Sequence, residues 1–403
     1  MSKRTWVAYL LIGIAFLAID FLMRDMARIK EFRYIVPKEY PTLTYTEQEH
    51  IERALQFLFP DSPGFFDITR LPDGLSFEDQ GQAKLFKVTR HDQSIQEENP
   101  SYLFREMINL STKTRKRVVQ ASLIGRDLGV SPKILYVSDD KKLLAREFIE
   151  GNDIYPQKLK NEDLFKTIVH KIKALHTGPL LSDAGRSLMK RTRALVIRLN
   201  KDSNFQAIPL VQALEAMATI ESAFNRAPDK VLSHLDLNPG NIIESPDGNV
   251  FLIDWDDSGL DERFADLGIF SHLMNLDEAQ KKKLLKFYFN NNPLPEHHAK
   301  LNLMEQISHL RVAAWAYSQA LKRDPKDTAF IDAFTRDNLL NNYGLPTGKD
   351  FLNDYYSGKV KLETSEDFQR LGHIFWREFF LYISSEAYIK DLELVNDISN
   401  TAN

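Results

Sequence analysis

The chain has 403 residues, of which 43% are hydrophobic and 27% are charged, and its formal net charge is -4 at pH 7. This length and composition suit a globular protein with a substantial core, and the slightly acidic balance argues against nucleic acid as a partner. The absence of cysteine excludes disulfides, thiolate zinc sites and a cysteine nucleophile.

An apolar run at residues 6–23 follows the basic pair Lys3 and Arg4. Its length is close to the minimum for a helix that crosses a hydrocarbon core of about 30 Å. A cleaved signal peptide and an apolar helix packed on the protein are the alternatives, although no small-residue cleavage site follows the run. We expect residues 1–30 to form an N-terminal apolar helix that anchors the chain in a membrane.

Residues 31–64 are expected to form a linker, which contains Pro37 and Pro41, and then a helix. The sequence Thr46-Glu47-Gln48-Glu49 predicts a capping box that opens this helix, and Pro60 marks its end.

Short strand patterns separated by turn residues come next. They predict a small antiparallel β lobe of five strands within residues 65–151. A turn with Gly74 and Ser76 joins the first two strands, the third strand ends at Arg105, and Gly151 follows the last. The expected strands cover residues 68–71, 84–88, 102–105, 134–137 and 143–149.

A helix is expected between the third and fourth strands, and its charge pattern is unusual. It has no acidic residue between Glu106 and Asp127, and Gln120 is its best-placed polar side chain. It also carries a basic run at residues 113–117, for which a solvated face is the ordinary reading and contact with anionic lipid the alternative.

Residues 152–403 show mostly helical spacing of apolar residues. We therefore predict a second, larger and mainly helical lobe. The expected helices cover residues 164–175, 185–199, 209–224, 281–289, 301–321 and 368–392.

One segment of this second lobe, residues 231–257, has the spacing of a phosphoryl-transfer site. His234, Asp236 and Asn241 fit the H-x-D-x-x-x-x-N catalytic loop, in which the Asp accepts the proton of the attacking hydroxyl and the Asn reaches Mg²⁺. Two short strands joined by a turn then lead to Asp254, whose carboxylate suits the same hard cation. The segment predicts Asp236 as catalytic base and Asn241 with Asp254 as metal ligands.

The sequences HLDLNPGNII, from His234, and LIDWD, from Leu252, resemble the Brenner motif and the metal-binding segment of the aminoglycoside phosphotransferase and choline/ethanolamine kinase superfamily. The resemblance extends over about residues 65 to 320. It implies an α+β, two-lobed protein-kinase-like fold and transfer of the γ-phosphoryl group of ATP to a hydroxyl of a small molecule.

The resemblance also implies roles for residues at matching positions. Arg105 would bind the nucleotide phosphates beneath the turn of Gly74 and Ser76, and backbone groups between Phe148 and Glu150 would face the adenine. Gln120 stands where a glutamate would pair with the cation, so either it replaces that acid or activity is lost.

Further roles implied by the resemblance concern the catalytic loop and the acceptor. His234 and Asp266 would support the loop. Asp256, Asp257 and Trp315 are candidates for binding the acceptor, for which an amino alcohol such as choline or ethanolamine is the leading hypothesis.

Three other readings stay open at this point. The acceptor could be an aminoglycoside or another polyol, the chain could bind a nucleotide or partner without turnover, or it could be a membrane-tethered scaffold whose tail recruits a partner. Because ATP is a cytosolic substrate, we expect the kinase domain to face the cytosol. The sequence identifies no protein partner.

Overall fold

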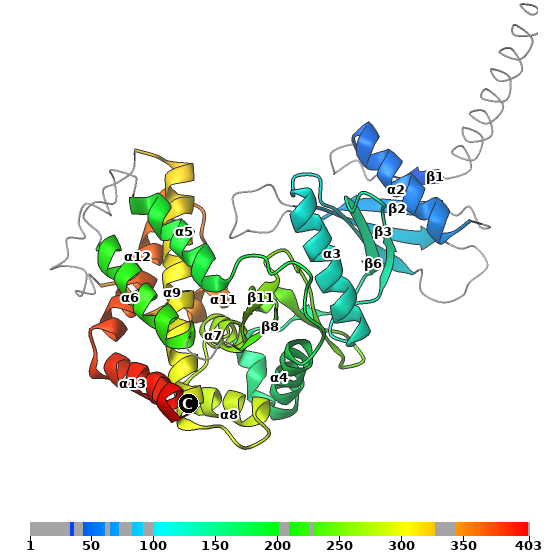
Figure 1. Cartoon of the computed structure of the whole chain (residues 1–403). Coiled ribbons are helices and arrows are strands. Elements are labelled where there is room, and N and C mark those ends of the chain that lie inside the picture. The colour runs from blue at the N-terminus through cyan, green and yellow to red at the C-terminus, as the bar shows by residue number, and fades with distance from the viewer. Residues whose placement is uncertain are drawn as a thin grey trace, which may run out of the picture. The chain divides into compact units, whose positions relative to one another are not determined.

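The computed structural model describes residues 33–35, 43–60, 65–71, 83–91, 100–200, 209–225, 229–326 and 344–401 (Figure 1). The chain divides into two compact units. The small unit comprises Met1–Val119 and Lys133–Phe148, and the large unit comprises Gln120–Pro132 and Ile149–Asn403. The predicted anchor, residues 6–23, and the predicted turn with Gly74 and Ser76 lie outside the described residues.

The described part of the small unit contains a mixed sheet with the strand order β1-β2-β3-β4-β6-β5. The strands from β2 to β6 pair in antiparallel fashion, as the strand patterns predict. The expected sheet was incomplete, because a further strand, β1, pairs in parallel with β2. The strands are β1 (Arg33–Ile35), β2 (Phe65–Arg70), β3 (Lys84–His91), β4 (Ser101–Glu106), β5 (Ile134–Val137) and β6 (Leu143–Glu147).

Helix α2 (Tyr45–Leu58) packs on this sheet, and its buried residues Ile51 and Leu55 join Phe66 and Phe104 in one core. The helix begins at a capping box, but not at the predicted one. Thr44 is the N-cap, and its side chain and backbone exchange hydrogen bonds with Glu47. The prediction at Thr46 was wrong by two residues, because Thr44 with Glu47 and Thr46 with Glu49 both have the spacing of a capping box.

Helix α3 (Thr112–Asp127) carries the basic run, in which Lys113 and Lys116 are exposed, as expected of a solvated face, whereas Arg115 and Arg117 are buried. The Arg115 side chain is buried and donates to the Leu110 carbonyl and to the Thr112 hydroxyl. The long side chain therefore supports the start of its own helix.

The large unit contains two small antiparallel sheets and is otherwise mostly helical. Its strands are β7 (Asn152–Asp153), β8 (Lys230–Ser233), β9 (Ile242–Glu244), β10 (Val250–Leu252) and β11 (Gly259–Glu262), with the 3-10 turns η1 (Pro156–Lys160) and η3 (Pro239–Asn241). Its described helices after residue 149 are α4 (Glu162–His176), α5 (Leu188–Asn200), α6 (Leu210–Asn225), α7 (Arg263–Leu273), α8 (Glu278–Tyr288), α9 (Pro295–Arg323), α11 (Gly348–Tyr356), α12 (Ser365–Ile383) and α13 (Glu386–Thr401).

Helix α9, yellow in Figure 1, is the central element of the large unit, and α5, α7, α12 and α13 pack against it. Most of its length is buried, including Trp315 and Tyr317. The single helical pattern expected at residues 368–392 is in fact two helices, because α12 ends before Ser384 and α13 begins at Glu386.

Within the described residues, no helix combines the length and the apolar character needed to cross a membrane. The predicted anchor is not among those residues.

Candidate active site

Two pairs of short strands hold the predicted catalytic segment in the large unit. Strand β8 pairs with β11 and leads into the loop, and β9 pairs with β10 as the hairpin that the sequence predicts. Strand β7 adds to the same hairpin through β9. A Cβ atom on Gly151 would lie 2.5 Å from the carbonyl oxygen of Glu244, so the chain can enter β7 only with glycine at this position.

Asp236 lies in the loop between β8 and η3, with one carboxylate oxygen held and the other not. The Asn241 amide donates to Oδ2 of Asp236 at 2.8 Å and to the Asp236 carbonyl at 2.9 Å. Within the described part of the chain, Oδ1 of Asp236 is buried and has no hydrogen-bond partner. A buried carboxylate oxygen without a donor is placed to accept a proton from a bound hydroxyl.

Asp266, in the first turn of α7, fixes the backbone of this loop. Its fully buried carboxylate accepts from the N–H of His234 at 2.8 Å and from the N–H of Leu235 at 2.6 Å. The ring of His176 also contacts it, with Nε2 at 2.9 Å from Oδ2. Leu235 has a φ of 64°, a left-handed conformation that costs a non-glycine residue about 1–3 kcal/mol. Asp266 therefore holds a strained turn just before Asp236.

His234 supports the loop from inside. Its ring is buried, Nε2 lies 2.8 Å from the Ile253 carbonyl, and the ring packs against Trp255 at a centroid distance of 4.7 Å. Burial lowers the pKa of His234, so the ring is neutral and its Nε2–H donates to that carbonyl. Trp255 is buried too, and its indole N–H donates to the Ser131 hydroxyl.

Asn241 and Asp254 come together through the hairpin. The Ile253 N–H donates to the Asn241 carbonyl at 3.0 Å, which brings Asp254 next to Asn241. Because Asn241 uses its amide nitrogen for Asp236, its side-chain oxygen would be the metal ligand. Among the described residues, no group of three or more His, Cys, Asp or Glu side chains could hold a metal ion. Two protein ligands nevertheless fit Mg²⁺, which usually takes its other ligands from water and phosphate oxygens.

Asp257 is part of a buried ion-pair network. Arg191 from α5 donates to its Oδ1 at 2.7 Å, and Arg311 from α9 pairs with its Oδ2. Although burial alone would raise the pKa of Asp257, the two guanidinium groups lower it. Both carboxylate oxygens are thus engaged by arginine, and the acceptor role expected for Asp257 has no support in this geometry.

Burial, together with the nearby Asp257 carboxylate, raises the pKa of Asp236 to about 7. The guanidinium of Arg311 acts in the opposite direction. A carboxylate whose pKa lies near neutrality is a better proton acceptor than an ordinary aspartate.

Trp315, the aromatic candidate for binding the acceptor, lies in the core of the large unit with other aromatic residues. Trp315 is 6% exposed and packs edge-on against Phe368 of α12, and Trp376 and Tyr317 are fully buried against each other. Asp256, the remaining acceptor candidate, is half-buried in the turn after β10. Helical spacing alone could not separate a pocket wall from the helix core.

Three tyrosines, from α11 and from the segment after β7, pack against one another. Tyr356 of α11 contacts Tyr155 at a centroid distance of 5.8 Å and Tyr355 at 5.4 Å. Burial and the two neighbouring tyrosines raise the pKa of the Tyr356 phenol, and the Asp236 carboxylate adds to this effect. We call Tyr155, Tyr355 and Tyr356 the tyrosine cluster. Tyr155 is 40% exposed, so the cluster has an open side.

The nucleotide-binding residues expected in the small unit are only partly described. Arg105 lies near the end of β4 with a half-buried side chain. Phe148 follows β6, donates from its N–H to the Ser101 carbonyl at 3.2 Å, and has the ammonium group of Lys87 4.3 Å above its ring centre.

In the large unit, Glu150 is exposed, and the Gln120 side-chain carbonyl accepts from the hydroxyl and the N–H of Ser182. The side-chain oxygen of Gln120 therefore holds the chain segment that follows α4.

The sequence model of the choline/ethanolamine kinase family matches residues 78–398, which is most of the chain. This chain belongs to that family. The resemblance seen in the sequence is confirmed, and the chain is a small-molecule kinase that phosphorylates a hydroxyl group.

Solved structures of related kinases share the fold. A choline/ethanolamine kinase family protein from Mesorhizobium loti is 16% identical, with a TM-score of 0.57 over 82% of this chain and 92% of that one. A choline kinase from Cryptosporidium parvum is 13% identical, with a TM-score of 0.54 over 83% and 93%. LicA in complex with AMP is 13% identical, with a TM-score of 0.51 over 84% and 100%. At these identities the likeness shows the fold alone.

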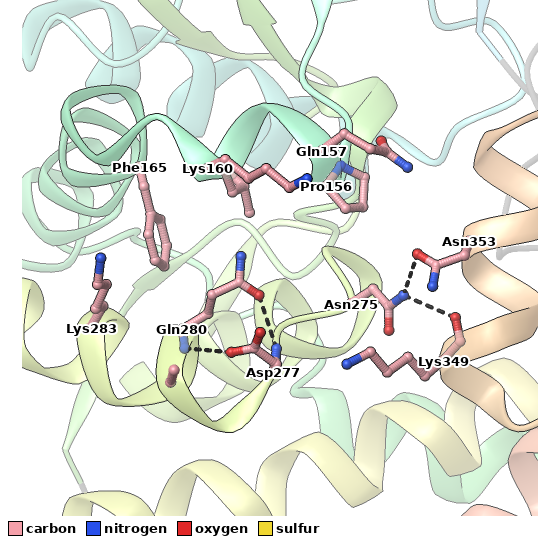
Figure 2. A pocket seen from close by; sticks show the side chains of 12 residues that line it. Pro156, Gln157, Lys160, Phe165, Asn275, Asp277, Gln280, Lys283, Lys349 and Asn353 are labelled. Carbon is pink, nitrogen blue, oxygen red and sulfur yellow. Dashed lines mark hydrogen bonds between the residues drawn. The ribbon is translucent and has the colours of Figure 1, made fainter.

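Figure 2 shows one pocket of this kinase, which has a volume of about 520 Å³. Its lining includes Pro156, which follows Tyr155, and Asn353, which precedes Tyr356 by one helical turn. Asn275 donates to the Lys349 carbonyl and to the Asn353 side chain across one wall. The described lining does not include the predicted catalytic or metal-binding residues.

Two parts of this site could not be predicted from the sequence. Arg191 stands in the basic stretch Lys190-Arg191-Thr192-Arg193 and Arg311 in a long helical pattern, and neither context indicates an ion pair with Asp257. Tyr155 and Tyr356 are about two hundred residues apart. The helical spacing of α11 could have marked Tyr356 as facing inward, but its partner becomes visible only in the folded chain.

Proposed function

We propose that this kinase transfers the γ-phosphoryl group of ATP to the hydroxyl of an amino alcohol such as choline or ethanolamine, with Asp236 as the base. The observation that carries the proposal is the arrangement of Asp236, in which Asn241 holds Oδ2 and leaves the buried Oδ1 without a partner among the described residues. That oxygen takes the proton of the acceptor hydroxyl as the oxygen–phosphorus bond forms and ADP leaves.

The other residues act by position and charge. The side-chain oxygen of Asn241 and the carboxylate of Asp254 would hold Mg²⁺, and Arg105 would bind the nucleotide phosphates. When bound, Mg²⁺ neutralises charge on the transferring phosphoryl group. Asp266 and His234 keep the loop in the shape that aims Asp236.

The tyrosine cluster supports an amino alcohol as acceptor. Electron-rich rings attract a quaternary or primary ammonium group by about 0.5–2 kcal/mol, and Tyr155 leaves the cluster open on one side. An aminoglycoside or another polyol is the alternative, and its acceptor hydroxyl would use the same base.

The test of the base compares the full chain with Asp236→Asn, using Mg-ATP and a panel of choline, ethanolamine and kanamycin. We expect turnover of choline or ethanolamine, and a loss of about 10²–10⁴-fold in kcat for the variant. Asp247→Asn, in the exposed turn before β10, is the control and should match the wild type. Equal turnover by Asp236→Asn would exclude Asp236 as the base, and nucleotide binding without turnover of any acceptor would favour a binding module.

The test of the acceptor site is Tyr155→Ala. Loss of one ring should raise the KM for choline by about 2- to 30-fold with little change in kcat, and Tyr155→Phe should keep most of the affinity. An unchanged KM in Tyr155→Ala would place the ammonium group elsewhere.

We also propose that residues 1–30 anchor the enzyme in a membrane with the kinase domain in the cytosol, where ATP is available. The apolar run at residues 6–23 supports this. An anchored protein should stay with the membrane fraction in an alkaline wash, and release by that wash would reject the anchor.

A further inference from the structure

We infer that Arg311 is a positioning residue that fixes the peptide in front of the catalytic base. This inference rests on the proposed role of Asp236. It starts from one guanidinium group that binds both the Leu235 carbonyl, at 2.7 Å through Nη1, and the Asp257 carboxylate through Nη2.

The peptide that Arg311 holds is strained. Leu235 has a left-handed backbone, which persists in a non-glycine residue only where its surroundings determine it fully. Its N–H donates to Asp266 of α7 and its carbonyl accepts from Arg311 of α9. Side chains from two helices thus hold both polar groups of the residue that precedes Asp236.

Arg311 is itself held in place. It is 4% exposed, and the carboxylate of Asp257 that it binds is fixed from the other side by Arg191, which also donates to the Asp257 carbonyl at 2.9 Å. The planar fork of arginine can reach two acceptors at once in a fixed direction. A lysine at this position would carry its donors on a single nitrogen at the end of a flexible chain, without the rigid fork that fixes the direction of both bonds.

This arrangement predicts a loss of catalytic alignment when Arg311 changes. A displacement of about 1 Å in a catalytic group can cost about 10²-fold in rate. We expect Arg311→Lys to lower kcat by roughly 10- to 100-fold while the KM for ATP changes by less than about threefold, because the nucleotide contacts do not depend on this peptide.

Arg191→Lys is the matched control. It weakens the same ion pair with Asp257, from the side of Oδ1, without removing the bond to the Leu235 carbonyl. We expect both variants to lose similar thermal stability, because each weakens one ion pair with Asp257. We expect Arg311→Lys to lose at least about threefold more kcat than Arg191→Lys, because only Arg311 also binds the Leu235 carbonyl. Equal losses of kcat would mean that Arg311 serves only the stability of the fold, and would overturn the inference.

A second measurement does not need turnover. Hydrogen exchange of the full chain, followed by mass spectrometry, reports on the amides of residues 231–241 in the absence of substrates. We expect exchange at least tenfold faster in Arg311→Lys than in Arg191→Lys, whereas equal exchange would overturn the inference. If the wild type turns over no acceptor, this comparison still decides the role of Arg311, and the proposed function fails separately.

Discussion

Replacing Asp266 by alanine should damage both the stability of the kinase and its catalytic loop. The carboxylate accepts from three buried donors, which are the N–H groups of His234 and Leu235 and the ring of His176. Each buried donor left without an acceptor costs about 1–3 kcal/mol, so the three together cost about 3–9 kcal/mol. Because water can enter the space and serve one or two of them, we expect a loss of about 3–5 kcal/mol.

This loss can be measured as the change in the free energy of unfolding in urea. Asp277→Ala is the matched control, because Asp277 also accepts a backbone N–H, from Gln280 at 2.8 Å, but at an exposed helix N-terminus. Loss of such a cap costs about 1 kcal/mol. If Asp266→Ala cost no more than Asp277→Ala, burial of the donors would not determine the stability of the loop, and our reasoning would be refuted.

Two further predictions concern stability. Burial raises the pKa of Asp261 to about 6, above its value of about 3.9 in the unfolded chain. Since the folded state then holds a proton that the unfolded state has released, stability should fall by about 3 kcal/mol as the pH rises from about 4 to above 6. Urea unfolding at several pH values should show a smaller fall in Asp261→Asn, and an equal fall would contradict the assignment. Thr44→Ala should lower the free energy of unfolding by about 1 kcal/mol through loss of the capping box. Thr46→Ala, at an exposed position, should change it by less than about 0.5 kcal/mol. Thermal unfolding of the two variants tests this, and a greater loss in Thr46→Ala would contradict Thr44 as the N-cap.

The sequence predicted the catalytic segment well because its chemistry depends on local spacing. One loop and one hairpin connect Asp236 to Asn241 and Asp254, so local structure alone brings these three residues together. Strand patterns also located β2 to β6 to within a few residues. These elements are short and are bounded by turn residues, so local signals determine them.

What the sequence could not show depends on contacts between distant segments. Arg311 binds the carbonyl of Leu235, which is 76 residues away in the sequence. Tyr155 contacts Tyr356, which is about two hundred residues further along the chain. For the same reason, the sequence did not show that Trp315 of α9 lies in the core, or that Arg115 and Arg117 in the basic run of α3 are buried. Periodicity shows that a side chain faces inward but not what it meets there.

The path of the chain through the two units has a consequence for its synthesis on the ribosome. Strand β4 pairs with β6, but the segment Gln120–Pro132, which folds with the large unit, lies between them in the sequence. At a translation rate of about 5–20 residues per second, roughly forty residues and about 2–8 s separate the emergence of the two strands. During that interval one edge of β4 has no partner, and an open strand edge is a template for pairing with other chains. The nascent kinase therefore carries an unpaired strand edge, open to association with other chains, until residue 147 has emerged.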